Sequence, residues 1–271
     1  MKYAAPLCLL LCFCLAIVRL ATGPVQPAVP AAGLEPANTA EQTPIEPKAK
    51  SDKKTEVKQM KMVDAPTSSY EKMKVREFTV YVHKDLIEKE PGLAEDCLDL
   101  LDNKILDVKR AFPASVYSKL QSVPIWLELN NPQRRGACYH PSPRWLANNG
   151  YNPDKVRSVE FANARDFLRW SKDQPYVLLH ELTHAYHHQV LGYDYAPIKE
   201  AFKSARDAGI YDKVLRVSGS YDKAYAITNE QEYFAECSEA FFGVNDFYPF
   251  VRGELKQHDP KMYELLKKIW K

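Results

Sequence analysis

The chain has 271 residues, with 37 Lys and Arg against 35 Asp and Glu, and its formal net charge is +2. Charges of both signs are mixed along the sequence, which excludes the strongly basic profile of a nucleic-acid-binding protein. The sequence contains no internal repeat and no glycine-rich phosphate-binding loop, so repeat proteins and phosphate-loop enzymes are excluded as well.

The first 23 residues predict a secretory signal peptide. Residues 4–18 form an apolar run too short for a comfortable membrane span, and residues 21–23 offer small side chains for cleavage. An uncleaved N-terminal anchor that ends at Arg19 is the alternative. No other segment is apolar enough to cross a membrane, so we expect a secreted or extracytoplasmic protein whose mature chain has no stable membrane span.

Residues 24–69 are expected to form a disordered linker rich in Pro, Ala and Lys, with no aromatic residue before Tyr70. Such a segment buries too little apolar surface to offset the entropy lost on ordering. Either a spacer or a pro-segment fits this composition. Residues 70–271 remain, and this length is sufficient for one domain with a sizeable core.

The order of elements expected in this domain is β-α-β-β-α-α. Alternating apolar residues predict a strand over 75–83, and periodic apolar positions predict a helix over 93–112. Two more strands are expected at 124–129 and 156–161, separated by a long loop over 130–153. The pattern predicts an α+β fold in which a small mixed sheet packs on two C-terminal helices.

The first of these helices is expected over 174–192 and contains the sequence HELTH at positions 180–184. Two histidines four residues apart present their imidazoles on one helix face, from which they can bind one Zn²⁺. The adjacent Glu181 can then take a proton from the zinc-activated water, as in the H-E-x-x-H peptide hydrolases. A helix with ordinary surface histidines is the alternative. The apolar stripe of this helix comprises Leu179, Leu182, Tyr186 and Val190.

A catalytic zinc site needs a third protein ligand and an open fourth position. Val190 occupies the place where a third histidine completes one version of the motif, so that version is excluded. A second helix, opened by a capping box of Thr228 and Gln231, supplies acidic side chains instead. Its buried stripe is expected to be Phe234, Cys237 and Phe241, with Glu232, Glu236 and Glu239 on the opposite face.

Glu232 is the better candidate for the third ligand. With Glu232 on the metal, Glu236 lies one turn later and can accept the N–H of a ligand histidine. With Glu236 on the metal, the matching place holds Ala240, which accepts nothing. We therefore predict one Zn²⁺ per chain, bound by His180, His184 and Glu232, with Glu236 supporting a histidine. A solvated helix face is the alternative, and it is the expected place of Glu230 and Glu239.

The sequences HELTH at 180–184 and EYFAE at 232–236 together resemble the gluzincin metallopeptidases, most closely the lethal-factor-like group that includes the Pro-Pro endopeptidases. That group carries a tyrosine seven residues before its ligand glutamate, and Tyr225 has this position here. The resemblance implies a zincin-like metallopeptidase domain. It also implies that the Tyr225 hydroxyl stabilises the oxyanion or protonates the leaving amine, whereas a loop tyrosine that only packs is the alternative.

The strand expected at 156–161 suggests how a peptide substrate binds. Peptidases often hold an extended peptide as an added strand on a sheet edge, and Ser158, Val159 and Glu160 are the candidates for that edge. An internal strand is the alternative. No catalytic role is assigned to His140, and a surface position is expected for His187.

Three cysteines, Cys97, Cys138 and Cys237, lie outside the signal segment and allow at most one intrachain disulfide. None has the spacing of a zinc ligand, and Cys237 is expected to be a buried free thiol in its helix.

These features predict a secreted zinc-dependent endopeptidase that acts on a peptide or protein substrate with Glu181 as general base. The alternative is a catalytically inactive or non-peptidase zinc-binding module that binds a surface or an extracellular partner. The intact Glu181 favours the enzyme, because a pure binder gains nothing from a general base. A zinc hydrolase of non-peptide amides is a third candidate. The sequence contains no signal for an oligomeric state.

Overall fold

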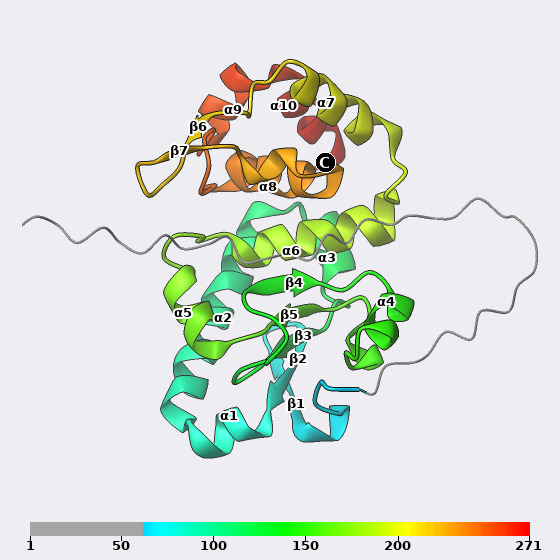
Figure 1. Cartoon of the computed structure of the whole chain (residues 1–271), viewed down its shortest axis with the longest axis vertical. Helices are drawn as coiled ribbons and strands as arrows, with labels where there is room; N and C mark the ends of the chain where they lie inside the picture. Colours follow the sequence, from blue (N-terminus) through cyan, green and yellow to red (C-terminus); the bar gives the residue numbers. More distant parts are fainter. Residues whose placement is uncertain (1–61) are drawn as a thin grey trace, which may run out of the picture. The chain divides into compact units, whose positions relative to one another are not determined.

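The computed structural model describes residues 62–271. The predicted signal peptide and most of the predicted linker lie outside the described residues. Residues 62–271 form an α+β fold with a five-stranded mixed sheet and about ten helices (Figure 1). No helix in this part of the chain is long and apolar enough to cross a membrane.

The five strands have the spatial order β1-β2-β3-β5-β4. Their bounds are β1 (Tyr70–Val75), β2 (Phe78–His83), β3 (Ile125–Leu127), β4 (Ala137–Tyr139) and β5 (Val159–Phe161). β2, β3 and β5 are parallel, whereas the outer strands β1 and β4 are antiparallel to their neighbours. The strand expected over 75–83 is therefore the second arm of a hairpin, whose first arm, β1, has three charged residues among its six.

One face of the sheet carries the core. The helices before the C-terminal part are α1 (Lys84–Lys89), α2 (Pro91–Ala111), α3 (Ala114–Leu120), α4 (Pro143–Asn148), α5 (Ala164–Trp170) and α6 (Val177–Tyr186). Alternate side chains such as Val80 and Val82 are fully buried on this face, together with Leu101 and Ile105 of α2. Each such side chain contributes about 1.5–3 kcal/mol to folding. α2 agrees with the helix predicted over 93–112.

The other face of the sheet is polar near its centre. Glu160 of β5 lies between Trp126 of β3 and Cys138 of β4 in the strand register. The residues that precede β5 include β4, α4 and the short 3₁₀ helix η2 (Pro153–Lys155), so the expected loop over 130–153 contains regular structure.

The folded part begins before Tyr70, where the linker was expected to end. Asp64 is buried and accepts hydrogen bonds from the Asn131 side chain and the Asn152 backbone. A 3₁₀ helix, η1 (Thr67–Ser69), then leads into β1. Residues 64–69 therefore belong to the domain.

The C-terminal part is mainly helical and packs on α6. It comprises η3 (His187–Leu191), α7 (Ala196–Asp207), the hairpin of β6 (Val214–Leu215) and β7 (Tyr221–Asp222), η4 (Tyr225–Ile227), α8 (Glu230–Phe242), α9 (Arg252–His258) and α10 (Pro260–Ile269). α8 lies against α6, as Figure 1 shows. The Trp270 ring stacks on Phe234 and also contacts Phe112 of the first part. The two helices predicted to carry the metal ligands are therefore neighbours.

α8 starts one residue later than the predicted capping box implies. Its N-cap is Asn229, whose side chain accepts a hydrogen bond from the Glu232 backbone at 2.9 Å. Thr228 follows η4 with a helical backbone, so its side chain does not cap α8. The predicted buried stripe is confirmed and consists of Phe234, Cys237 and Phe241.

The three cysteines of the described chain, Cys97, Cys138 and Cys237, are all buried free thiols. They form no disulfide with one another.

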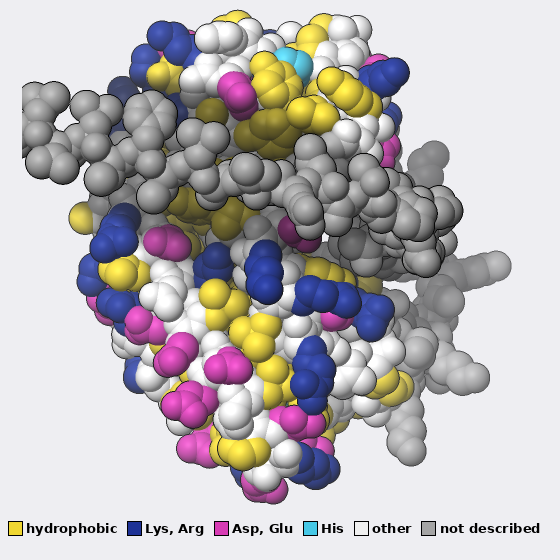
Figure 2. Space-filling view, turned by 90° about the vertical axis from the view of Figure 1, so that its left-hand side faces the viewer, with side chains coloured by type: hydrophobic (Ala, Val, Ile, Leu, Met, Phe, Trp, Pro, Cys, Tyr) yellow, Lys and Arg dark blue, Asp and Glu magenta, His cyan; other side chains and the backbone are white. Residues whose placement is uncertain are grey.

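On the surface, basic and acidic side chains are interspersed over the face shown in Figure 2. Pairs such as Arg76–Asp102, at 2.6 Å, are partly exposed, and such pairs contribute at most about 1 kcal/mol each. The stability of the domain therefore depends mainly on its buried contacts.

Candidate metal centre

α6 and α8 bring three side chains to one point. His180 and His184 lie one turn apart on α6, and Glu232 lies in the first turn of α8. The Nε2 atom of His180 is 3.0 Å from the Nε2 atom of His184 and 3.0 Å from a carboxylate oxygen of Glu232. The same oxygen is 3.3 Å from the Nε2 atom of His184. The structure thus brings the three predicted ligands together.

The hydrogen bond made by Nδ1 of His180 determines the state of its other ring nitrogen, Nε2, which faces His184 and Glu232. Nδ1 donates a hydrogen bond to Glu239 at 2.6 Å, which leaves the lone pair of a neutral imidazole on Nε2. Nε2 faces the Nε2 atom of His184 and an oxygen of Glu232. Electron-pair donors that face one another this closely need a proton or a metal cation between them, and two imidazoles with a carboxylate are a donor set that Zn²⁺ can bind.

The electrostatics of the cluster favour a positive charge among these three side chains. Burial disfavours the protonated form of His180, but hydrogen bonds to Glu232 and Glu239 outweigh burial and hold its pKa well above the usual value. Burial also disfavours ionised Glu232, yet its interactions with the His184 and His180 rings hold its pKa well below the usual value. The cluster therefore favours a bound positive charge, which a proton or a metal ion can supply.

The carboxylate that supports His180 is Glu239, whereas the sequence analysis expects Glu236 in this role. The nearest oxygen of Glu236 lies 4.0 Å from Nδ1 of His180. The other oxygen accepts a hydrogen bond from the Asn245 side chain at 3.0 Å. Glu239 was expected on a solvated face, but it is only 4% exposed.

Helix geometry explains this difference. Seven residues turn an α-helix to within about 20° of its starting direction, whereas four residues leave it about 40° away. Glu239 therefore points more nearly in the direction of Glu232 than Glu236 does. The sequence does contain this information, because Glu239 lies seven residues after Glu232 and Glu236 only four.

Behind Glu239 lies a second layer of buried acidic groups. Burial, together with the negative charges of Asp246 and Glu239, raises the pKa of Glu236 well above its usual value. A guanidinium nitrogen of Arg216 lies 3.8 Å from Asp246 and offsets part of the negative charge. Burial raises the pKa of Glu239 as well, but the hydrogen bond to His180 opposes that shift, so Glu239 rather than Glu236 is placed to hold the negative charge beside the Nδ1 proton of His180.

The two residues predicted to act in catalysis lie on or next to the ligand-bearing helices. Glu181 follows His180 on α6 and is only 6% exposed. Tyr225 lies in η4, which leads into α8 and packs against it, and its side chain is half-buried.

The helix that carries the histidines changes character after Tyr186. It continues as a π-helical segment, η3, and the chain then turns at Gly192, which has a φ of 80°. A wider helical turn rotates the following side chains away from the α-helical pattern. Val190, expected in the apolar stripe, is consequently 39% exposed, and His187, expected at the surface, is fully buried.

His187 is not part of the metal centre. Within residues 62–271 neither of its ring nitrogens has a hydrogen-bond partner. Its ring packs edge-on against Tyr193 and Phe234, and burial lowers its pKa to about 3. The ring is therefore a neutral packing element behind the metal-binding face.

The expectation that Ser158, Val159 and Glu160 form a peptide-binding edge is wrong. β5 pairs with β3 on one side and with β4 on the other, and these three residues are fully buried. The strand pattern missed β4, because only three residues within a long irregular segment form it.

The edge of the sheet on the α6 side is β4, which packs against α6. The Tyr139 hydroxyl forms a hydrogen bond with His188 at 2.9 Å and accepts another from Gln189 at 3.0 Å. These two bonds join β4 to the segment that follows the two candidate ligand histidines.

Four groups of described side chains bring possible metal-binding atoms within 4.8 Å of one another, and one of them is His180, His184 and Glu232. Comparisons with protein-family models, curated proteins and solved structures gave no match for this chain. Its function is therefore inferred from the geometry of its side chains.

Proposed function

We propose that this protein is a zinc-dependent endopeptidase with a zincin-like domain of the gluzincin type. The observation that carries the proposal is the convergence of one atom each from His180, His184 and Glu232, next to the buried Glu181. Zinc bound by these side chains would polarise the scissile carbonyl and lower the pKa of the attacking water to about 7.

The side chains around the ligands supply the rest of the chemistry. Glu181 would take a proton from the attacking water and deliver it to the nitrogen of the leaving amine. Glu239 holds the proton on Nδ1 of His180 and so keeps the Nε2 lone pair available. The Tyr225 hydroxyl, from the element that leads into α8, would donate a hydrogen bond to the oxyanion.

The edge strand next to α6 supports a peptide as the substrate class. β4 lies at one end of the sheet order, so its outer side has no strand partner within the described residues. An extended peptide can pair with such an edge through main-chain hydrogen bonds. Because β4 packs against α6, a peptide added there would run past the histidines and Glu181.

A module that only binds zinc and a partner is the second candidate. The burial of Glu181 favours the enzyme, because a carboxylate removed from water without being a metal ligand lowers stability. An enzyme retains such a buried carboxylate because it needs a general base, whereas a binding module does not need one. The signal peptide predicted over residues 1–23 supports an extracytoplasmic place of action.

The test is hydrolysis of a peptide library by the purified protein, with and without a chelator, followed by the Glu181→Gln variant. We expect cleavage that the chelator abolishes and zinc restores. Glu181→Gln should lower kcat by about 10²–10⁴-fold while the zinc content stays unchanged. Glu200→Gln, an exposed change on α7, is the matched control and should have normal activity. Full turnover in Glu181→Gln would remove Glu181 from the mechanism, and a zinc-loaded wild type that cleaves nothing would favour the binding module.

A further inference from the structure

A second group of metal-binding atoms lies on the opposite face of the sheet. Cys138 and His140 are two residues apart, so both point away from the face to which Tyr139 belongs. Cys138 pairs in register with Glu160 of β5. We propose that Cys138, His140 and Glu160 bind a second Zn²⁺, independently of the candidate metal centre.

The Nε2 atom of His140 lies within hydrogen-bonding distance of both other members of the group. The Nε2 atom of His140 is 3.3 Å from the Cys138 sulfur and 2.7 Å from an oxygen of Glu160. A proton on this nitrogen is donated to Glu160, as in an ion pair, and leaves the Cys138 sulfur only a share of the same N–H. A cation bound by all three atoms uses one lone pair of each, which satisfies every member of the group.

The distances are close to those that zinc requires. Zinc lies about 2.3 Å from sulfur and about 2.0–2.1 Å from nitrogen or oxygen, so tetrahedral ligand atoms are roughly 3.3–3.6 Å apart. The sulfur-to-nitrogen distance of 3.3 Å needs to lengthen by about 0.3 Å, and the nitrogen-to-oxygen distance of 2.7 Å by about 0.6 Å. The ligands of the candidate metal centre, at 3.0–3.3 Å, are drawn together in the same way.

Burial and charge also fit a bound metal. Cys138, His140 and Glu160 are only 7%, 1% and 0% exposed, so a metal held there is shielded from solvent. A thiolate and a carboxylate together neutralise the two charges of Zn²⁺, and thiolate with imidazole is a ligand pair that zinc prefers.

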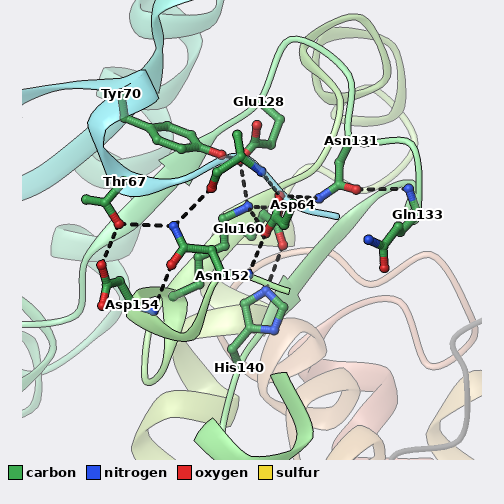
Figure 3. A network of polar contacts seen from close by, with 12 residues as sticks. Asp64, Thr67, Tyr70, Glu128, Asn131, Gln133, His140, Asn152, Asp154 and Glu160 are labelled. Atoms are coloured by element: carbon green, nitrogen blue, oxygen red, sulfur yellow. Dashed lines mark hydrogen bonds and ion pairs between the residues drawn. The ribbon is translucent and has the colours of Figure 1, made fainter. Parts of the chain in front are cut away.

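Charged side chains of both signs lie around this group. Lys155 lies 2.6 Å from the second oxygen of Glu160 and also forms ion pairs with Glu128 and Asp64. Figure 3 shows Glu160, Glu128 and Asp64 gathered close to His140. Arg134 adds a positive charge near Cys138. Lys155 thus lies against Glu128 and Asp64 outside the ligand set, and a neutral zinc site would add no net charge to these buried groups.

The site would have a structural effect on the edge of the sheet. Its ligands flank Tyr139 on β4, and they join β4 to the internal strand β5. A metal there would hold Tyr139 in position for its hydrogen bonds to His188 and Gln189.

The test uses cobalt as the probe on the metal-free full-length protein. A cobalt ion bound by a thiolate gives an intense charge-transfer absorption in the near ultraviolet. The candidate metal centre contains no cysteine, so this band reports on the second site alone. We expect the wild type to develop the band with one equivalent of cobalt at that site and to bind two Zn²⁺ per chain, measured by elemental analysis.

The variants assign the band to its ligand. Cys138→Ser, a nearly isosteric change, should lose the band and bind one zinc, whereas Cys97→Ala and Cys237→Ala should keep both. His180→Ala combined with His184→Ala should also bind one zinc but keep the band, which separates this proposal from the proposed function. Circular dichroism checks that each variant is folded.

A folded wild type without the band and with a single zinc would overturn the proposal and leave a metal-free thiol–imidazole contact. Persistence of the band in Cys138→Ser would also overturn it. The wild-type measurement decides the question even if a variant fails to fold.

Discussion

Removal of the Glu239 carboxylate should weaken zinc binding at the candidate metal centre, and removal of the Glu236 carboxylate should not. Glu239 accepts the hydrogen bond of His180 Nδ1 at 2.6 Å, in a pair whose side chains are only 12% and 5% exposed. A hydrogen bond to a charged group contributes about 1.5–3 kcal/mol. Loss of a carboxylate that supports a metal-binding histidine weakens metal affinity about 10–100-fold, which is about 1.4–2.7 kcal/mol. The two estimates agree, so Glu239→Ala should raise the Kd for zinc within this range.

A matched pair of isosteric variants isolates the effect of charge. Glu239→Gln keeps an acceptor oxygen but loses the charge, and neutral hydrogen bonds are about half as strong, so we expect a roughly 3–10-fold weaker affinity. Glu236→Gln should change the affinity by less than about 3-fold, because a neutral acceptor still serves Asn245. Competition with a chromophoric chelator measures each Kd. The reasoning is refuted if Glu236→Gln weakens zinc binding as much as Glu239→Gln does, or if Glu239→Ala binds zinc like the wild type.

Three further outcomes are expected. Tyr225→Phe should lower kcat by about 10²–10³-fold with little change in KM, because an oxyanion contact acts only in the transition state; steady-state kinetics with an unchanged kcat would leave Tyr225 a packing residue. The pKa of His187, lowered to about 3 by burial, lies below the unfolded value of about 6.5, so stability is lost as pH falls through this window, by about 2 kcal/mol between pH 7 and pH 5. His187→Leu should abolish that contribution in urea unfolding at the two pH values, and an unaltered pH dependence would contradict it. Lys155→Met should lower the free energy of unfolding by about 3–5 kcal/mol, because three buried carboxylates lose their counter-charge; a wild-type urea midpoint would show that they do not need it.

Local signals in the sequence predicted the elements that are long and strongly periodic. α2, α6 and α8 occur where apolar periodicity placed them, and the i, i+4 histidines lie on one face of α6 as helix geometry requires. The choice of Glu232 over Glu236 rested on Glu236 as the support of His180. A Glu232 oxygen does lie within 3.3 Å of both histidine nitrogens, but Glu239 supplies that support.

Sequence patterns did not predict the features that depend on contacts between residues far apart in the chain. β4 has only three residues, and it is a strand because β5 provides its hydrogen-bonding partner. That pairing makes β5 internal and moves the exposed edge of the sheet to β4. The same pairing places Cys138 beside Glu160, a contact between residues 22 positions apart that no local spacing indicates.

The sequence by itself determined which residues can serve as zinc ligands and as a base, because those roles depend on residue type and on spacing within one turn of a helix. Only the tertiary structure decided which carboxylate supports His180, since that depends on how α8 packs against α6. It also decided that His187 is buried, because its ring packs against Tyr193 and against Phe234 of α8. Packing between elements, rather than propensity within them, determines both outcomes.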